Sequence, residues 1–275
     1  MSKYLLRSVL LLLITYNSVW TQTDQPYPPL NLVSIPTAGT LPRGSFTFES
    51  LVIKNGGIVS RLSVGFTDNF SFGVSYGAQN LIGNNRPSIN KTTPEVQIKY
   101  RVFDESEKMP AIVYGLDTQG RGSYHSIDTI SIRGQDSIHT LNRYDQKSWG
   151  MYMVMSKNWN LLGNLGLHVG VNKNLSENDD GDNDFNIFLG VDKELNRSFS
   201  LLIEYNAALN DNLTDDNYDD LNDITFGRGK GYLNAGVRWA ISQNLMLEIN
   251  FNNINQNTKA EYTNREIKIM YSESF

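Results

Sequence analysis

Cysteine is absent from this chain of 275 residues. The protein therefore has neither a disulfide framework nor a thiolate metal site. Proline is also scarce, at 8 residues, whereas 22 residues are glycine, and this balance is typical of many strands joined by turns. Basic residues are outnumbered by acidic ones, which gives a formal net charge of -5 at pH 7. We therefore do not expect nucleic acid as a partner.

Long apolar runs are missing as well. A membrane-spanning helix requires roughly 20 apolar residues, so any insertion into a membrane must use strands. One short apolar run, Val9–Ile14, follows the basic residues Lys3 and Arg7, which is the pattern of a signal peptide. We predict a signal peptide over residues 1–21. The next segment, residues 22–44, is proline-containing and irregular, and we predict an extended periplasmic lead-in there.

Polar and apolar residues alternate in segments that follow one another along the rest of the chain. In the clearest segment the apolar positions are Val96, Ile98, Tyr100 and Val102, and the polar positions are Glu95, Gln97, Lys99 and Arg101. Alternation with a period of two residues is typical of a β-strand with one apolar face. About twelve such segments occupy residues 45–275, so the sequence predicts one all-β domain over that range.

The connections between these segments alternate in length. Short ones such as Thr67–Asn69 are followed by longer ones such as Thr118–Ser148, and the hairpin signal Asn55-Gly56-Gly57 takes a place in the long series. Outer-membrane barrels combine an even strand number with short periplasmic turns and longer external loops. We therefore predict a closed antiparallel up-and-down transmembrane β-barrel in the bacterial outer membrane, in contact with outer-membrane lipid and lipopolysaccharide.

The last segment, Arg265–Phe275, alternates in the same way and ends on an aromatic residue. We expect it to pair with Ser45–Ile53, because this pairing closes the ring and removes both edges of the sheet. Its Tyr271 and Phe275 resemble the signal of bacterial outer-membrane proteins that the barrel-assembly machinery recognises. Further aromatic residues at strand starts fit a periplasmic girdle, namely Phe70, Trp159 and Phe199.

If the apolar faces contact lipid, the opposite faces line the interior of the barrel. The predicted lumen-lining residues are Arg61, Glu95, Lys99, Arg101, Asp117, His168, Glu204, Arg238 and Glu248. Their charges have both signs, as expected for ion pairs across a narrow barrel. Two interpretations remain open: paired charges fill and stabilise the interior, or they line a small polar channel for sugars or anionic oligosaccharides.

No catalytic residue is predicted. His168 lies on an inner face with no Ser or Asp at a motif spacing. A lipid-hydrolysing site would need a partner such as Ser156, and the sequence alone does not place that residue nearby. His125 and His139 fall in a polar loop, where we expect them to be solvated.

A calcium site is the one metal-binding hypothesis that the sequence offers. The loop carries carboxylates at alternate positions, Asp180, Asp182 and Asp184, which can converge on a calcium ion. It lacks the bidentate glutamate of a twelve-residue EF-hand loop, so the match is partial. The alternative is that external loops are acidic for solubility or to bridge divalent ions to lipopolysaccharide. No other cofactor is predicted.

Several stretches resemble one family of bacterial outer-membrane barrels, the YjbH-type proteins. They include Pro94-Glu95-Val96-Gln97-Ile98-Lys99-Tyr100-Arg101, Gly190-Val191-Asp192-Lys193 and Tyr232-Leu233-Asn234-Ala235-Gly236-Val237-Arg238-Trp239. The resemblance extends from Ile35 to Phe275. It implies a passive conduit or structural accessory in exopolysaccharide biosynthesis or export, with polysaccharide and export proteins as partners. It implies no catalytic site.

Two functions from other classes remain as alternatives. One is an outer-membrane lipid hydrolase, and the other is a soluble periplasmic β-sandwich that binds carbohydrate. A shift in gel mobility on heating would separate the barrel from the sandwich. Lipase activity that is lost in the His168→Ala variant would favour the hydrolase.

Overall fold

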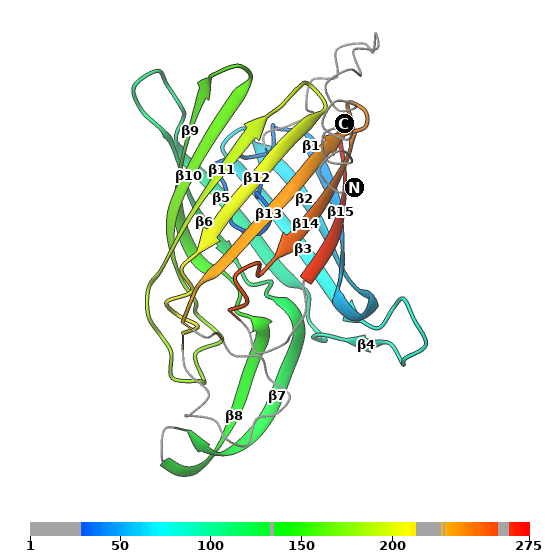
Figure 1. Ribbon diagram of the computed structural model, residues 1–275, viewed down its shortest axis with the longest axis vertical. Coiled ribbons are helices and arrows are strands. Elements are labelled where there is room, and N and C mark those ends of the chain that lie inside the picture. Colours follow the sequence, from blue (N-terminus) through cyan, green and yellow to red (C-terminus); the bar gives the residue numbers. More distant parts are fainter. Residues whose placement is uncertain (1–28, 133–134, 213–226, 228, 258–263) are drawn as a thin grey trace, which may run out of the picture.

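The protein folds into one closed β-barrel, with a long β-hairpin beyond one of its ends (Figure 1). The computed structural model describes residues 29–132, 135–212, 227, 229–257 and 264–275. The predicted signal peptide over residues 1–21 therefore lies outside the described residues. No helix in the described part of the chain is long and apolar enough to cross a membrane.

Twelve strands form the barrel wall, and each is antiparallel to its two neighbours. They are β1 Ser45–Ile53, β2 Gly57–Thr67, β3 Phe70–Gln79, β5 Glu95–Phe103, β6 Ala111–Asp117, β9 Gly150–Asn160, β10 Asn164–Lys173, β11 Asn186–Glu194, β12 Phe199–Asn206, β13 Tyr232–Ala240, β14 Leu245–Asn252 and β15 Asn264–Ser274. The short strand β4, Ser88–Ile89, pairs with the end of β3. The predicted all-β, up-and-down barrel is confirmed.

Strand β15 closes the ring against β1. Their antiparallel register runs from Ser45 opposite Ser274 to Val52 opposite Ile267. This is the pairing that the sequence predicted for the last alternating segment. Because every wall strand has two partners, the sheet has no free edge that would leave backbone groups without hydrogen bonds in lipid.

Apolar side chains cover the outside of the wall, whereas its charged side chains mostly point inwards, next to a smaller set of buried apolar ones. On β15, Ile267 and Ile269 are 46% and 44% exposed, whereas the alternating Glu266 and Lys268 are 1% and 2% exposed. This is the reverse of a protein in water, where buried charges are rare. An outward apolar belt of this kind is suited to contact with lipid acyl chains.

The connections alternate in length as predicted, but one long connection contains regular structure. Strands β7 (Arg121–Ile132) and β8 (Gln135–Gln146) form a separate two-stranded sheet that projects from the end opposite the C-terminus (Figure 1). From the sequence, Thr118–Ser148 was expected to be a loop. Register shifts interrupt the pairing of β7 with β8 at two places, so neither strand displays an unbroken alternation.

The segment before β1 lies inside the barrel. Leu32, Val33 and Ile35 are each 0% exposed. The prediction that residues 22–44 form an extended periplasmic lead-in is therefore wrong for residues 29–41, called the lumen segment from here on, while residues 22–28 lie outside the described residues. The physical reason is apolar burial, because each such side chain contributes about 1.5–3 kcal/mol when it is removed from water.

Deleting Phe275 is expected to reduce insertion of the barrel several-fold. Its N–H donates to the Gly44 carbonyl oxygen at 2.8 Å, and its ring stacks on Phe46 with centroids 6.3 Å apart, so it fastens the seam between β1 and β15. Heat-modifiable protein in membrane fractions measures insertion. Phe185→Ala, which removes another exposed phenylalanine ring, is the control. Equal insertion of the two variants would contradict the assembly-signal hypothesis for Tyr271 and Phe275.

Candidate functional site

The lumen segment is a short hairpin loop. The Thr37 N–H donates to the Leu30 carbonyl oxygen at 3.1 Å, and between them Asn31 and Pro36 form an isolated antiparallel bridge. Lys99 Nζ on β5 donates to the carbonyl oxygens of both Leu30 and Thr37. The two arms of the hairpin therefore lie side by side, and both ends leave the loop in the same direction.

Glu204 on β12 binds the tip of this hairpin through its backbone. Its carboxylate accepts the N–H of Ser34 at 2.9 Å and the N–H of Ile35 at 3.0 Å. Asn234 Nδ2 on β13 donates to the same carboxylate at 2.7 Å. The side chain of Glu204 is 0% exposed, so its charge is stabilised by these donors rather than by water.

Cations and an indole bind the carbonyl oxygens of the hairpin. Lys268 Nζ on β15 donates to Leu32 at 3.1 Å and to Val33 at 3.2 Å. The other donor and carbonyl pairs are Arg238 with Asn31 at 3.1 Å, Arg121 with Val33 at 2.6 Å, Lys99 with Thr37 at 3.1 Å, and Trp149 Nε1 with Ser34 at 3.1 Å. The barrel thus offers donors to the carbonyl groups and an acceptor to the N–H groups of the same loop.

Leu32 and Ile35 fill a socket at Gly190 on β11. A Cβ at position 190 would lie 2.4 Å from Leu32 Cδ1 and 2.5 Å from Ile35 Cδ1, so any larger residue would require both side chains to shift. The other members of this buried cluster are Val33, Ala38, Ala111, Val113, Tyr152, Val154, Phe188 and Leu202, with Trp149 packed against them. The interior of the barrel therefore contains a hydrophobic core.

The predicted lumen-lining residues lie on inner faces, and several are fixed in ion pairs. Arg61 lies 3.0 Å from Asp117. Arg238 and Lys268 each lie 2.7 Å from Glu248, which is 0% exposed. A buried carboxylate between two cations is held by strong charge-assisted hydrogen bonds. The charged side chains of the inner face therefore form ion pairs with one another or hydrogen bonds with the lumen segment.

Glu95 and Arg101 lie towards opposite ends of the interior. Glu95 accepts a hydrogen bond from Tyr144 of β8 at 3.0 Å and pairs with Lys91 at 2.7 Å, so it joins the wall to the projecting hairpin. Arg101 donates to the carbonyl oxygen of Asp68 in the turn between β2 and β3 at 2.7 Å. Arg101 therefore lies at the rim of the barrel.

Neither the lumen segment nor several of the side chains that bind it, among them Lys268, Arg121 and Trp149, were identified from the sequence. Lys268 alternates with apolar residues on β15, so the pattern already placed it inside. Arg121 is the first residue of β7 and Trp149 follows β8, and no clear alternation pointed to either residue. His125, expected to be solvated, is half-buried and lies 2.7 Å from Asp145, while the side chain of His139 falls outside the described residues.

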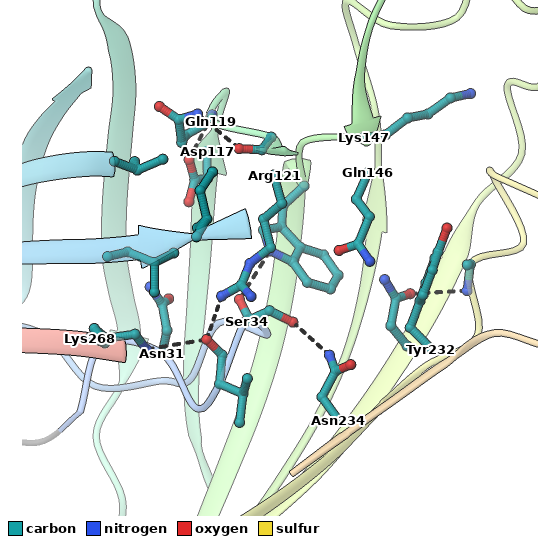
Figure 2. Close-up of a pocket in the computed structure, with 18 of the residues that line it drawn as sticks. Asn31, Ser34, Asp117, Gln119, Arg121, Gln146, Lys147, Tyr232, Asn234 and Lys268 are labelled. Carbon is teal, nitrogen blue, oxygen red and sulfur yellow. Dashed lines mark hydrogen bonds between the residues drawn. The ribbon is translucent and has the colours of Figure 1, made fainter. Parts of the chain in front are cut away.

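A cavity of about 60 Å³ remains between the lumen segment and the projecting hairpin (Figure 2). Asn31 and Ser34 line it from the lumen segment, and Gln146 and Tyr232 line it from the strands around it. A single water needs at least about 10–15 Å³ of such volume. This cavity therefore has room for a few water molecules and is too small for a sugar chain.

Ser156, His168 and Asp192 form a chain of hydrogen bonds across three strands. Ser156 Oγ lies 2.7 Å from His168 Nδ1, and His168 Nε2 lies 2.8 Å from Asp192 Oδ1. The sequence alone did not predict that Ser156 lies near His168. The register of β9 with β10 places the two residues directly opposite each other. The Ala38 N–H of the lumen segment donates to Ser156 Oγ at 2.8 Å, so the chain also anchors that segment.

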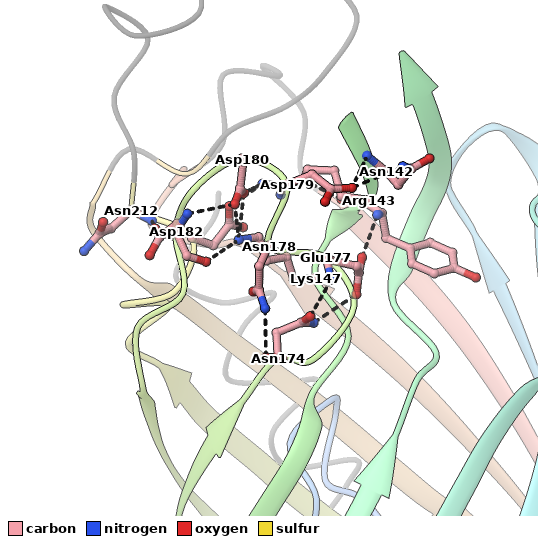
Figure 3. Close-up of polar contacts among 12 residues, drawn as sticks. Asn142, Arg143, Lys147, Asn174, Glu177, Asn178, Asp179, Asp180, Asp182 and Asn212 are labelled. Atoms are coloured by element: carbon pink, nitrogen blue, oxygen red, sulfur yellow. Dashed lines mark hydrogen bonds and ion pairs between the residues drawn. The ribbon is translucent and has the colours of Figure 1, made fainter. Parts of the chain in front are cut away.

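Arg143 organises the loops at the end of the barrel that bears the projecting hairpin (Figure 3). It is 0% exposed and lies 2.9 Å from carboxylate oxygens of Asp180 and Asp211. Burial alone would lower the pKa of Arg143, but the charges of Asp211 and Asp180 outweigh it and raise the pKa above its ordinary value. Lys147 also pairs with Asp180, at 2.6 Å. The hairpin is thereby tied to two external loops.

The three carboxylates of the calcium hypothesis do not share one environment. Asp180 is bonded to Lys147, whereas Asp184 is exposed. Burial raises the pKa of Asp182, which disfavours the charged form that a calcium ligand needs. Among the described side chains, no three acidic, histidine or cysteine residues are grouped to hold a metal ion. A calcium site at these positions stays a prediction.

Arg143→Met is expected to loosen the projecting hairpin from the barrel. Removing the guanidinium leaves Asp180 and Asp211 with less compensation, and breaking a buried ion pair costs about 3–5 kcal/mol. Limited proteolysis should cut the hairpin about tenfold faster or more. Arg86→Met, at an exposed arginine, is the control and should leave the rate unchanged. Equal rates in both variants would show that Arg143 does not tie the hairpin down.

Comparisons with known proteins give likenesses to solved barrels. No protein-family model matches the sequence, and no curated protein sequence matches it. A KdgM porin is 8% identical with a TM-score of 0.43, and the match covers 84% of this chain and 99% of that chain. The same porin in complex with disordered oligogalacturonate is 9% identical, with a TM-score of 0.44 and the same coverage.

OmpT, an outer-membrane protein of Vibrio cholerae, is 8% identical with a TM-score of 0.30, covering 83% of this chain and 96% of that chain. Identities this low transfer no ligand to the present protein. The closed ring of twelve strands, its outward apolar belt and the buried charged side chains of its inner face make the protein a β-barrel of the bacterial outer membrane.

Proposed function

We propose that the protein is an accessory barrel of an exopolysaccharide biosynthesis or export system, and that its resting state is closed. The resemblance of stretches such as Gly190-Val191-Asp192-Lys193 to YjbH-type proteins supports the link to polysaccharide. The observation that carries the closed state is the burial of Leu32, Val33 and Ile35 inside the barrel at 0% exposure. This role requires no catalysis.

The lumen segment acts as the closure in this proposal. Its backbone is bound by Glu204 on β12, Arg238 on β13 and Lys268 on β15. Each contact is charge-assisted and removed from water, so the contacts reinforce one another. A polysaccharide could pass only after this segment had moved, and the barrel otherwise serves as a structural accessory.

Purified protein in planar lipid bilayers is expected to give no steady conductance. The reason is that the lumen segment fills the described interior, where the cavities beside it measure about 60 and about 20 Å³. A twelve-stranded barrel with an empty interior, by contrast, would conduct ions. Large, stable current steps from the unmodified protein would contradict the closed resting state.

The link to polysaccharide needs a separate measurement. Cells that lack the protein should release less exopolysaccharide than cells that produce it, when both are grown and extracted in parallel. Restoring the gene should restore the release. Unchanged amount and composition of the polysaccharide would remove the proposed role in export while leaving the closed state standing.

A second candidate function, ester hydrolysis, is favoured by the chain Ser156–His168–Asp192. A nucleophile, a base and an orienting carboxylate at hydrogen-bond distances are the parts of an acyl-transfer site. Ser156 is only 5% exposed, however, and its oxygen already accepts the Ala38 N–H. Hydrolysis of a p-nitrophenyl ester that is lost in both Ser156→Ala and His168→Ala would favour this candidate. Activity at the level of the blank would exclude it.

A further inference from the structure

We infer that the interior of the barrel is a binding site for a peptide hairpin, and that it accepts the sequence of residues 29–41 as a separate molecule as well as in the chain itself. The inference goes beyond the proposed function. It rests on closure by the lumen segment and does not depend on a role in polysaccharide export.

The chemistry of the site fits a peptide backbone. Glu204 accepts two consecutive N–H groups, those of Ser34 and Ile35. Lys268 donates to the two consecutive carbonyl oxygens just before them, on Leu32 and Val33. An anion set against N–H groups and a cation set against carbonyl groups is the complementarity that recognises a turn of polypeptide. These contacts are made to backbone groups of the hairpin. They do not require that the hairpin be covalently joined to β1.

Apolar side chains give the site its sequence selectivity. Leu32 and Ile35 occupy the socket over Gly190, where any side chain on the wall would collide with them. Val33 contacts the next glycine in the wall, Gly236, where a Cβ would lie 3.0 Å from Val33 Cγ2. A ligand must therefore present large aliphatic groups on either side of the turn, in addition to its backbone.

The geometry lets a peptide enter without being threaded through the barrel. Leu30 and Thr37 are hydrogen-bonded to each other, and both contact Lys99, so the two ends of the hairpin leave together. They leave towards the rim where Thr40 Oγ1 donates to the carbonyl oxygen of Asp68, in the turn between β2 and β3. A free hairpin can follow the same route inwards from that rim.

The attached segment has an advantage over a free peptide through its effective concentration, which is of millimolar order for short connections. The unmodified protein should therefore bind added peptide poorly. The test uses the full chain with Leu32→Asp and Ile35→Asp, which weakens its own segment and leaves the wall unchanged. The probe is a fluorescein-labelled synthetic peptide with the sequence of residues 29–41, and the readout is fluorescence anisotropy in detergent.

The doubly substituted protein is expected to bind this peptide at least about tenfold more tightly than the unmodified protein does. A peptide that carries the same two aspartates should not bind. Adding Gly190→Leu to the doubly substituted protein should abolish binding, because the socket is filled. Glu204→Gln in the same background should weaken binding about tenfold, through the lost charge on the acceptor.

The fold of every variant is checked by its heat-modifiable gel mobility. If the doubly substituted protein is folded and binds the peptide no better than the unmodified protein, the inference is overturned. Equal binding of the unsubstituted and aspartate-bearing peptides would overturn it too, because adsorption to detergent or to the outer belt would explain that result. Polysaccharide release plays no part in the readout, so a failure here is distinct from a failure of the export role.

Discussion

Gly190→Leu is expected to convert a closed barrel into a conducting one. A leucine at this position must occupy space that Leu32 and Ile35 fill, since even its Cβ would lie within 2.5 Å of both. The backbone of β11 cannot retreat, because it is hydrogen-bonded to β10 and to β12. The whole leucine side chain competes with Leu32 and Ile35 for the same space, so we expect the lumen segment to be displaced. Overpacking costs about 1–3 kcal/mol, and each displaced aliphatic side chain loses about 1.5–3 kcal/mol of burial.

Planar-bilayer recording of purified protein measures this opening. Discrete current steps are expected from Gly190→Leu under conditions in which the unmodified protein stays silent. Val191→Leu is a matched control, because it enlarges the next residue of the same strand on the outer side. If Gly190→Leu inserts normally and remains silent, the segment does not control the opening of the barrel.

Glu248→Ala is expected to lower the free energy of unfolding by about 3–5 kcal/mol, the usual cost of removing one partner from a buried ion pair. The carboxylate is 0% exposed and lies 2.7 Å from both Arg238 and Lys268. Its removal leaves two buried cations with less compensation. Lys268 also holds carbonyl groups of the lumen segment, so the loss should reach the hairpin as well.

Urea unfolding of the barrel in lipid vesicles, followed by tryptophan fluorescence, measures this change. Glu107→Ala, at an exposed glutamate, is the control and should stay within about 0.5 kcal/mol of the unmodified protein. A similar small effect for Glu248→Ala would mean that water reaches the two cations and replaces the carboxylate.

The wall of the barrel was predictable because its signal is local. A strand with one face in lipid shows its alternation within eight or so residues, as Leu245–Asn252 does, and the bounds of β14 follow from that pattern alone. The pairing of the last strand, β15, with the first, β1, was also predictable from the sequence, because only this pairing closes the ring. The β7–β8 hairpin did not follow, since its register shifts break the alternation.

The lumen segment could not be predicted in the same way, because its contacts are distant in the sequence. Ser34 and Glu204 are separated by 170 positions, and Leu32 and Lys268 by 236. The prolines around the segment indicated an irregular lead-in, which is correct locally. Whether such a stretch lies in water or in a barrel depends on side chains that only the closed ring brings together. The same holds for Ser156 and Asp192 on either side of His168.

The core inside the barrel has a thermodynamic consequence. A barrel with a water-filled lumen exposes little new apolar surface to water inside it when it unfolds. Here the unfolding exposes Leu32, Val33, Ile35 and Phe188, which are all 0% exposed in the folded protein. Apolar hydration raises the heat capacity by about 0.45 cal/mol/K for each Å². Calorimetry should therefore find that the interior makes a positive contribution to the heat-capacity change of unfolding. Such a contribution is usual for a water-soluble protein, although the outer surface of this barrel faces lipid.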